Sequence, residues 1–523
     1  MLEHASIAPK MTLMQDLLLY PAAQSPERTA LMTLDENWDF GRLLHRARQY
    51  SQALDASGLA NGDRVGLLME NGPQYVSAYF GTFLAGGVAV PLDYKSQSEK
   101  LAAILRDCHV RRLVIAPLQV PNVVGILEHK QHLTWIISPS ELGVRSDGIK
   151  CLSVDAIEGM PINIRQDHSS PAVINYTSGS SGLPKGVTMS HRAILANTRS
   201  IVSYLELNAD DRVMQILPFF YCYGASLLHT HFMVGGSVAI DNRFIYPSSV
   251  LSNMEKSGCT GFAGVPSTFH TLSTKCDLSK LRNSKLRYMT QAGGRMDPQL
   301  VDVIRSAIAP SRFFVMYGQT EASSRLTFLQ PERWIDKRGS VGKPIPGVSI
   351  KIGTESGREL PCGSVGEIWA QGENLMTEYW GNADETARVL VDGWLRTGDL
   401  GRIDEEGFLF IEGRVKGIIK SRGYRISPSE VEDVLGRHPA VYEAAVMGIP
   451  DSQDGEQVSA VLSLKQGASA SETELAKHCR MFLPAYKIPR RFVLVPELPK
   501  SASGKLQRES LLTLFQTVSE KFL

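Results

Sequence analysis

One stretch decides how this chain is organised: Val173 to Gly186, with the sequence V-I-N-Y-T-S-G-S-S-G-L-P-K-G. Its first residues, Val173–Tyr176, are apolar, β-branched or aromatic and predict a buried strand. The glycines that follow let the backbone present successive N–H groups to one anion, and the hydroxyls and a lysine add donors and positive charge. The stretch therefore predicts a triphosphate-binding loop made by Thr177, Ser178, Gly179, Ser180, Ser181, Gly182 and Lys185.

Two other interpretations of this stretch are disfavoured. A P-loop has Gly-Lys-Ser/Thr opening a helix, whereas here Pro184 precedes the lysine and Gly186 follows it. A flexible Gly/Ser linker has the right composition, but linkers rarely begin at a buried strand or end in Pro-Lys-Gly.

Length and composition indicate a multidomain globular enzyme. The chain has 523 residues, enough for about three domain-sized units. Its hydrophobic content of 43% and charged content of 21% are typical of globular proteins. A formal net charge of +1 provides no general attraction for nucleic acid or an anionic membrane. Seven cysteines without a C-x-x-C pair favour a reducing compartment over a disulfide or zinc framework.

The sequence also predicts a cytoplasmic protein. The segment Met1–Lys10 contains Glu3 and has no long apolar run, so it is unlike a signal peptide. No stretch approaches the roughly 18 uninterrupted apolar residues of a membrane span.

The first third alternates helical and strand patterns. Apolar residues at helical spacing predict helices near residues 40–54, 75–84 and 101–106, and short apolar runs predict strands near residues 64–69, 88–91, 113–116 and 135–137. Such alternation predicts an α/β fold with mostly parallel sheets covered by helices. Ligands of these sheets bind at the carboxyl ends of the strands, where the Thr177 loop follows its strand.

The middle third supplies candidate pocket residues. Phe219–Ser226 is rich in aromatic residues and is followed by His229 and His231, for which a core or pocket-lining role is favoured over metal binding because no third ligand has suitable spacing. Strands are predicted at residues 260–265, 289–294 and 313–316. The second ends in Gly293-Gly294, which permits close approach of a flat ligand. The third leads into Tyr317-Gly318-Gln319-Thr320-Glu321, whose side chains suit base stacking, phosphate binding and a hard cation.

From Gly339 the chain is richer in Gly and Pro and predicts an antiparallel β-subdomain. Arg396-Thr397-Gly398-Asp399 places a carboxylate after a turn, and Gly413-Arg414-Val415-Lys416 follows the next strand. A compact region comes after it, with a helix opening at Ser427-Pro428. The polar stretch Pro499–Lys505 presents a lysine near the end.

Together these motifs resemble the adenylate-forming superfamily of acyl-CoA synthetases, freestanding adenylation domains and firefly luciferase. The resemblance extends from about Thr29 to Arg508 in family order, through T-S-G-S-S-G-L-P-K-G, Y-G-Q-T-E, R-T-G-D, G-R-x-K and P-K-S-A-S-G-K. It implies a large N-terminal domain at residues 1–413, with mostly parallel sheets plus a β-subdomain. A hinge at residues 414–416 and a small, mobile α+β C-terminal lid domain at residues 417–523 would follow.

The resemblance also implies a role for each motif. ATP phosphates would bind Thr177 to Lys185, and the cofactors would be ATP, Mg²⁺ and CoA or phosphopantetheine. The remaining implied site residues are Gly293, Gly294 and Tyr317 at the adenine, Thr320 at the α-phosphate, Glu321 on Mg²⁺, Asp399 at the ribose, Arg414 at the ribose or phosphate, Lys505 as catalytic lysine, Lys416 at the hinge, Gly423 at the thiol tunnel, and Phe220, Tyr221, Tyr223 and Gly224 in the acid pocket.

The implied reaction has two steps. A carboxylate attacks the α-phosphate of ATP and pyrophosphate leaves. A thiol of CoA or of a carrier-protein phosphopantetheine then attacks the acyl-adenylate and releases AMP. Because little proton transfer is needed in the first step, catalysis depends on positioning and on neutralising charge at phosphate oxygens.

Departures from the family pattern narrow the substrate. Tyr221 stands where many acyl-CoA synthetases have His, and Phe219–Ser226 contains no acidic residue. A buried α-ammonium group without a partner is costly, so an amino-acid substrate is disfavoured. We expect an acid that is uncharged apart from its carboxylate, with an apolar or aromatic body. Residues 340–366 are too few for the insertion of fatty acyl-AMP ligases, which favours a thioester-forming enzyme.

Three alternatives remain beside the leading hypothesis of an acid–thiol ligase. One is an acyl-AMP ligase that loads an acyl carrier protein only, and another is a luciferase-like oxidase. A degenerate, non-enzymatic scaffold is disfavoured because Lys185, Glu321, Asp399, Arg414 and Lys505 are all present.

Lys505→Ala should abolish adenylation but retain thioester formation from supplied acyl-AMP, because the matching family lysine acts in the first half-reaction only. The measurement is pyrophosphate exchange beside thiol transfer in one preparation. An equal loss in both would contradict the assigned role.

Overall fold

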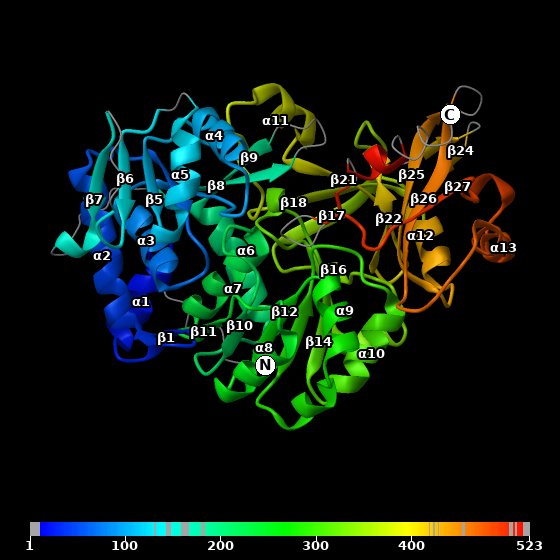
Figure 1. The fold of residues 1–523 in the computed structure, drawn as a ribbon, viewed down its shortest axis with the longest axis horizontal. Coiled ribbons are helices and arrows are strands. Elements are labelled where there is room, and N and C mark those ends of the chain that lie inside the picture. Colours follow the sequence, from blue (N-terminus) through cyan, green and yellow to red (C-terminus); the bar gives the residue numbers. More distant parts are fainter. Residues whose placement is uncertain are drawn as a thin grey trace. The chain divides into compact units, whose positions relative to one another are not determined.

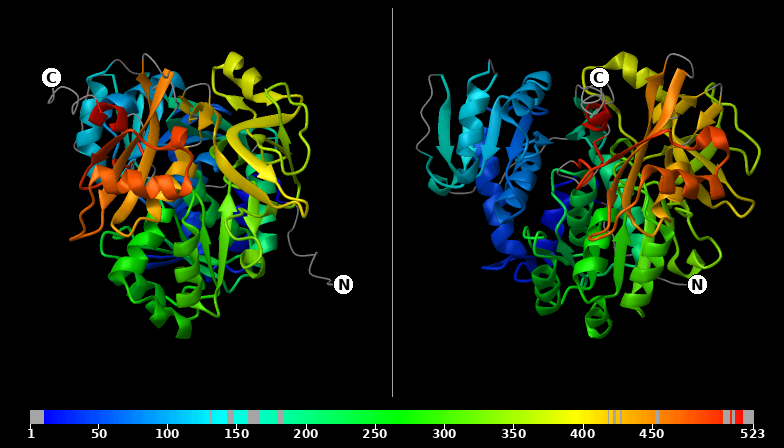
Figure 2. Two further views of the ribbon diagram at one scale, coloured as in Figure 1. Left: turned by 90° about the vertical axis from the view of Figure 1, so that its right-hand side faces the viewer. Right: turned by 45° about the vertical axis from the view of Figure 1, so that its right-hand side comes forward.

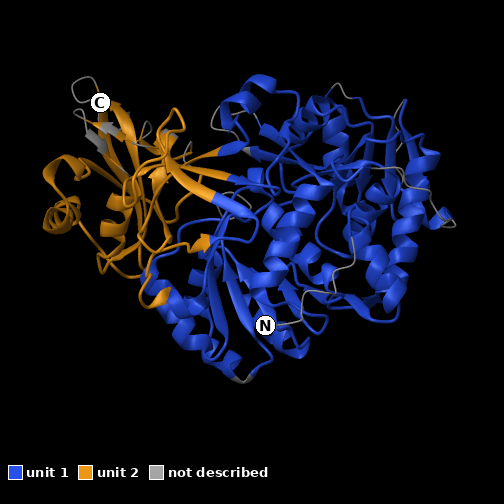
Figure 3. Cartoon of the chain, turned by 180° about the vertical axis from the view of Figure 1, so that it is seen from behind, with its two compact units in different colours: residues 1–333, 344–349, 371–395 blue, residues 334–343, 350–370, 396–523 orange. Residues whose placement is uncertain are grey.

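The computed structural model describes residues 11–129, 132–142, 148–157, 167–178, 184–417, 419–421, 424–426, 428–451, 455–500, 506–507 and 510–515. The chain forms two compact units (Figure 3). Unit 1 comprises residues 1–333, 344–349 and 371–395, and unit 2 comprises residues 334–343, 350–370 and 396–523. Gly179, Ser180, Ser181, Gly182, Gly423 and Lys505 lie outside the described residues.

Unit 1 is built on two large sheets. Neighbouring strands β14, β13, β12, β10, β11 and β1 of the nine-stranded sheet are parallel, and both edges add antiparallel strands. Its order is β16 (Lys343–Pro344), β15 (Thr327–Leu329), β14 (Arg312–Tyr317), β13 (Tyr288–Gln291), β12 (Gly261–Gly264), β10 (Arg212–Gln215), β11 (Ser237–Ile240), β1 (Thr29–Met32) and β2 (Asn37–Asp39).

The second sheet has eight strands and carries the motif at Val173. Strands β8, β4, β3, β5, β6 and β7 are parallel neighbours, while β9 and β19 are antiparallel. The order is β19 (Glu378–Tyr379), β9 (Pro184–Ser190), β8 (Pro171–Ser178), β4 (Val88–Pro91), β3 (Arg64–Leu68), β5 (Arg112–Ile115), β6 (Trp135–Ser138) and β7 (Lys150–Ser153).

Helices cover the sheets of unit 1, and α6 and α7 pack on each other between them: α6 contacts β8 and β9, and α7 contacts β10 and β11 (Figure 1). The helices are α1 (Asp16–Gln24), α2 (Phe40–Ala56), α3 (Pro73–Leu84), α4 (Ser98–Asp107), α5 (Val120–Leu127), α6 (His191–Leu205), α7 (Cys222–Met233), α8 (Pro247–Lys256), α9 (Pro266–Lys275), α10 (Pro298–Ile308) and α11 (Ala383–Val389).

Local chemistry explains where these helices form. In α2 the residues Phe40, Leu43, Ala47 and Leu54 recur at helical spacing and are fully buried. The Asp39 carboxylate caps this helix by accepting a hydrogen bond from the Arg42 N–H at 2.6 Å. The predicted helices and strands of the first third are thereby confirmed, with shifts of a few residues at their ends.

The structure adds a hairpin at the Val173 motif that the sequence analysis did not include. We expected a loop from Thr177 to Lys185, but β8 extends to Ser178 and β9 begins at Pro184, with Thr177 opposite Lys185 in an antiparallel ladder. The pairing was not predicted because the glycines and serines of this stretch have low strand propensity. The second strand is completed by V-T-M-S at residues 187–190, which are buried.

The C-terminal half forms two smaller sheets. One runs β17 (Val348–Gly353), β18 (Gly366–Gly372), β21 (Trp394–Ile403), β20 (Leu390–Val391), with β22 (Leu409–Arg414) also on β21. The antiparallel pairing of β21 with β20 and β22 agrees with the predicted β-subdomain. The other runs β24 (Tyr424–Ile426), β23 (Ile419–Ser421), β26 (Gly455–Leu464), β25 (Val441–Asp451), with β27 (Arg491–Leu494) on β26 (Figure 2).

The second of these sheets has its own hydrophobic core. Helices α12 (Pro428–Gly436) and α13 (Glu472–Phe482) pack on each other, and α12 contacts β25. Among the described residues, the buried apolar clusters of this region come from residues 419–515. A separate core supports the predicted lid domain, while its boundary at residues 414–416 stays a prediction. Lys416 lies in the single turn η6 (Val415–Gly417).

In the part of the chain that the structure describes, no helix combines the length and apolarity required to cross a membrane.

Gly224→Ala should destabilise the protein by about 1–3 kcal/mol, because overpacking in the first turn of α7 forces the backbone apart. A Cβ at Gly224 would lie 2.1 Å from the Pro218 carbonyl oxygen and 3.0 Å from the Leu217 carbonyl oxygen. Gly72→Ala is the control, since Gly72 has an extended backbone and no atom within 4 Å of that Cβ position. Equal thermal unfolding midpoints for the two variants would contradict the close approach.

Candidate active site

The carboxyl ends of three neighbouring parallel strands bring together the residues predicted to frame a flat ligand. Strand β13 leads into Gly293-Gly294, β14 ends at Tyr317, and β12 leads towards Pro266. Gly293 has a φ of +84°, and a Cβ there would lie 3.4 Å from the Tyr221 hydroxyl. A Cβ at Gly294 would meet Pro266 at 3.3 Å. The positive φ of Gly293 therefore requires glycine at this position. The carboxyl edge of the sheet, with no side chain at either glycine, suits a planar ligand.

The predicted phosphate residue Thr320 lies beside the aromatic motif. It opens the short turn η4 (Thr320–Ala322) just after β14 and is buried. Its hydroxyl lies 3.5 Å from the Sγ atom of Cys222, the first residue of α7. This contact connects the turn that follows β14 with the first residue of α7.

Glu321, the next residue, is held by Tyr379. The Tyr379 hydroxyl donates a hydrogen bond to Glu321 Oε1 at 2.9 Å. Burial, followed by the carboxylates of Glu321 and Glu385, raises the pKa of Tyr379, so its hydroxyl keeps the proton that it donates. The main chain adds a second bond, from Met376 N–H to the Glu321 carbonyl at 2.8 Å.

Lys185 joins this group from the hairpin. Its ammonium forms an ion pair with Glu385 of α11, and the two side chains are 19% and 17% exposed. The same ammonium lies 5.2 Å from the centre of the Tyr379 ring. Tyr379 is opposite Val187 in the β9–β19 ladder, so Lys185, two residues away on the same face, is its diagonal neighbour. We name Lys185, Glu321, Tyr379 and Glu385 the phosphate cluster.

Unit 2 contains a second pair of predicted site residues. Asp399 and Arg414 are opposite each other in the β21–β22 ladder, and Arg414 Nε donates to Asp399 Oδ1 at 2.9 Å. The Asp399 side chain is 8% exposed, while that of Arg414 is 72% exposed. The pair therefore holds a carboxylate in place and leaves most of the guanidinium open to solvent.

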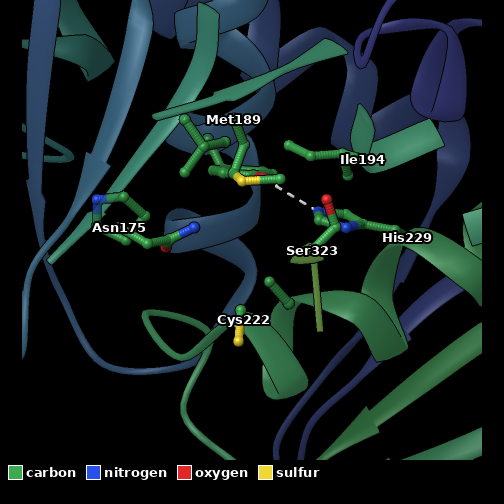
Figure 4. A pocket seen from close by; sticks show the side chains of 10 residues that line it. Asn175, Met189, Ile194, Cys222, His229 and Ser323 are labelled. Carbon is green, nitrogen blue, oxygen red and sulfur yellow. Dashed lines mark hydrogen bonds between the residues drawn. The ribbon is translucent and has the colours of Figure 1, made fainter. Parts of the chain in front are cut away.

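A small cavity of about 20 Å³, room for about one water, lies in unit 1 beside Cys222, which contacts Thr320 (Figure 4). Helix α7 contributes Cys222, Ala225 and His229, which recur at helical spacing on one face. The other lining residues come from α3, β4, β8, β9, α6 and the turn after η4, and are Tyr79, Pro91, Val173, Asn175, Met189, Ile194 and Ser323.

The residues predicted for the acid pocket are not among those that line this cavity, and they have several different surroundings. Tyr223 is buried, donates to the Thr290 carbonyl at 3.0 Å and has the Arg325 guanidinium 4.0 Å over its ring. Phe220 is in edge contact with the Tyr94 ring at 6.2 Å. Gly224 faces the Pro218 backbone and Tyr221 faces Gly293. Their roles toward an acid stay predictions.

The two histidines of α7 occupy the core and the pocket wall, as expected. His231 is bonded on both ring nitrogens, to the Tyr288 hydroxyl at 3.0 Å and to the Leu227 carbonyl at 2.8 Å. Burial lowers the pKa of His231 to about 4 and that of His229 to about 3, so both are neutral near pH 7. Among the described residues, no group of three or more His, Cys, Asp or Glu side chains is arranged to hold a metal ion.

Comparison with known proteins identifies the family. The model of the family described as AMP-binding enzyme matches residues 20–380, and that of the AMP-binding enzyme C-terminal domain matches residues 430–505. The chain belongs to the AMP-binding enzymes.

Several relatives of this AMP-binding enzyme match over nearly the full length. A long-chain-fatty-acid–CoA ligase of Bacillus subtilis (strain 168) is 32% identical over 539 residues, covering 97% of this chain and 95% of the relative. A fatty acid–[acyl-carrier-protein] ligase of Streptomyces coeruleorubidus is 29% identical over 514 residues, covering 97% of each. The o-succinylbenzoate CoA synthetase of Bacillus subtilis, solved with its acyl-adenylate intermediate, is 30% identical with a TM-score of 0.83, covering 95% of this chain and 97% of that chain. It has also been solved with ATP and a magnesium ion.

The phosphate cluster of this AMP-binding enzyme suits a magnesium–nucleotide complex. Mg²⁺ keeps several waters and is usually bound through one or two carboxylates together with substrate phosphates. Glu321 is a single oriented carboxylate beside the cationic Lys185, so it fits a metal ion that arrives with a nucleotide rather than one held in a protein cage.

Sequence reasoning missed Tyr379, Glu385 and Cys222. Tyr379 and Glu385 lie near residue 380, far along the chain from Lys185, and carry no motif of their own. One signal was available: Asn382 followed by Glu385 marks a helix start, and the Asn382 side chain does cap α11 by accepting the Glu385 N–H at 3.0 Å.

Tyr379→Phe should raise the Mg²⁺ concentration needed for half-maximal pyrophosphate exchange by about tenfold. We expect Glu321 to hold the metal ion, and loss of an outer-shell hydrogen bond to such a carboxylate costs about 10–100-fold in affinity. Titration of Mg²⁺ at saturating ATP measures this. Tyr246→Phe changes an exposed tyrosine and is the control. An unchanged Mg²⁺ requirement in Tyr379→Phe would show that the hydroxyl does not orient Glu321.

Proposed function

We propose that this AMP-binding enzyme activates a carboxylic acid with ATP and transfers the acyl group to the thiol of CoA. One observation carries the proposal: Thr320 lies between the phosphate cluster, through Glu321, and the pocket, through Cys222. An acid bound beside Cys222 and Thr320 would thus have its carboxylate next to the residues proposed to hold phosphates. The o-succinylbenzoate CoA synthetase of Bacillus subtilis was solved with its acyl-adenylate intermediate, which supports the acid-activation step.

The first step forms a mixed anhydride. A carboxylate oxygen attacks the α-phosphorus, the bond to the β-phosphate oxygen breaks, and pyrophosphate leaves with the electron pair. Lys185 would neutralise phosphate charge, and Thr320 would donate to an α-phosphate oxygen. A Mg²⁺ ion held by Glu321 would supply further charge neutralisation at the phosphate oxygens. No proton has to move in this step, so positioning supplies most of the rate.

The remaining site assignments follow the family order. Thr177, Ser178 and the loop Gly179–Gly182 would hold the β- and γ-phosphates, and Gly293, Gly294 and Tyr317 would frame the adenine. We assign Asp399 to the ribose hydroxyls, Arg414 to the ribose or phosphate, and Lys505 to the adenylation step.

In the second step the thiolate sulfur attacks the acyl carbonyl, the bond to the phosphate oxygen breaks, and AMP leaves. We assign the change between steps to a hinge at Lys416, with Gly423 beside the thiol. CoA is the favoured acceptor because residues 340–366 are too few to contain the insertion of fatty acyl-AMP ligases, which favours an enzyme that forms thioesters. A carrier-protein phosphopantetheine is the second candidate, since one full-length relative is named as a ligase of fatty acid and acyl carrier protein.

None of the seven cysteines, all of them in the described ranges, is in a disulfide, which supports a cytoplasmic location.

Lys185→Ala should lower acid-dependent pyrophosphate exchange by about 10²–10³, the effect of removing one preorganised charge from developing phosphate charge. The assay uses a panel of aliphatic and aromatic carboxylic acids with ATP and Mg²⁺. Lys256→Ala, which changes an exposed lysine of α8, should leave exchange unaltered.

The acceptor is then tested with free CoA and with a phosphopantetheinylated carrier protein in parallel. Thioester formation with CoA is the expected result, and transfer to the carrier alone would replace CoA by the second candidate. Absence of exchange with every acid in the panel would overturn the proposed function.

A further inference from the structure

The turn that carries Thr320 and Glu321 has a backbone that its own residues do not favour. The two serines that follow η4 have positive φ angles, +55° at Ser323 and +107° at Ser324. Residues with a Cβ rarely adopt such angles, and strain of this kind persists only where the surrounding structure imposes it. The contacts that impose it therefore also determine where Thr320 and Glu321 lie.

One buried side chain bonds to the main chain on both sides of these serines. Asn374, which is 2% exposed, donates through Nδ2 to the Ala322 carbonyl at 3.1 Å and to the Arg325 carbonyl at 3.0 Å. Because a carbonyl oxygen only accepts hydrogen bonds, the NH₂ end of the amide must face the two carbonyls, and both of its hydrogens are used. The Ser323 hydroxyl adds a third bond, donated to the Asn374 main-chain carbonyl at 2.8 Å.

Both ends of the turn are fixed at strand β14. The N–H of Leu326 donates to the Tyr317 carbonyl at 2.8 Å. A Cβ at Gly318 would lie 2.2 Å from the Ser324 carbonyl oxygen, so the serine pair packs directly on the start of the turn. With both ends held, any change at the serine pair must be taken up by the residues between them, Thr320 to Ala322.

The segment that begins at Asn374 also contacts the phosphate cluster. Met376 donates its N–H to the Glu321 carbonyl at 2.8 Å. Thr377 donates its N–H to the Thr188 carbonyl at 2.9 Å, and Thr188 lies in β9, the strand that also contains the lysine of the cluster. Asn374 is thus the first anchor of a segment that bonds both to the turn and to β9.

We propose that Asn374 is a positioning residue for the adenylation step. By holding the serine pair in its left-handed conformation, the Asn374 amide orients the Thr320 hydroxyl and the Glu321 carboxylate toward the phosphates of ATP. The inference rests on the proposed function and specifies what orients its site. The amide faces main-chain carbonyls, so it acts on the substrates through the turn and not by contact.

The test compares the two half-reactions in one preparation. The first is pyrophosphate exchange with ATP, Mg²⁺ and an acid that is active in the panel. The second is thioester formation from the synthetic acyl-adenylate of the same acid, with the thiol acceptor that the wild-type enzyme uses. Only the first half-reaction needs the triphosphate and the metal ion. The readout is the ratio of the first rate to the second, in which the folded fraction cancels.

Asn374→Leu keeps the approximate size of the side chain and removes both donors. It should lower the ratio by about tenfold or more and raise the Mg²⁺ concentration for half-maximal exchange, since loss of a group that orients a metal-binding carboxylate costs about 10–100-fold in metal affinity or activity. Asn374→Ser, which is smaller and polar, is made beside it and should change both quantities in the same direction.

Asn253→Leu is the matched control. The Asn253 side chain of α8 also makes two hydrogen bonds, one donated to Asp241 at 3.0 Å and one accepted from Ser257 at 3.1 Å. Its loss should change stability only and leave both the ratio and the Mg²⁺ requirement at their wild-type values.

A wild-type ratio and Mg²⁺ requirement in the Asn374 variants would overturn the inference and leave acid activation intact. Failure of both variants to fold would assign Asn374 to stability alone and would overturn the inference as well. Absence of exchange by the wild-type enzyme with every acid of the panel would instead overturn the proposed function, and this inference with it.

Discussion

The hydrogen bond from Tyr379 to Glu321 is the interaction on which the arrangement of the candidate site depends. It joins a two-residue strand at the edge of the eight-stranded sheet to the turn that follows β14 of the nine-stranded sheet. Around it, the Asn374 side chain donates to the carbonyls of Ala322 and Arg325 at 3.1 and 3.0 Å, and Ser323 donates to the Asn374 carbonyl at 2.8 Å. Hydrogen bonds in such a network polarise one another, so together they stabilise the turn more than the sum of the separate bonds.

Charge is distributed between the cluster and the pocket in opposite ways. The cluster places a lysine, two carboxylates and a phenol within reach of one another, as binding of phosphates and a divalent cation requires. The neighbouring pocket is lined by neutral groups, and its histidine is kept neutral by burial. The charged residues proposed to bind the nucleotide and the neutral cavity beside them are therefore different electrostatic environments.

Much of this architecture could be predicted from the sequence. The strands of residues 64–68, 88–91 and 112–115 and helix α2 follow from hydrophobic periodicity, and the motifs at Gly293 and Tyr317 lie at strand ends as expected, whereas Thr177 is paired within β8. The partners of those motifs could not be predicted. Lys185 and Glu385 are 200 residues apart, and Glu321 and Tyr379 are 58 apart. Such pairs are set by tertiary folding, and local propensity contains no information about them. The residues that line the pocket were missed for a similar reason, because a helix face becomes a wall only once its neighbours are known.

The pairing of β9 fixes the spacing of the residues along this strand. This strand is paired on both sides, Thr177 opposite Lys185 on one edge and Tyr379 opposite Val187 on the other. Side chains alternate along a strand, so inserting a single residue between Lys185 and Val187 would turn Lys185 to the opposite face and separate it from Glu385. We therefore expect descendants of this sequence to vary in length outside the paired residues and to keep the spacing from Lys185 to Thr188, even where the side chains between them change.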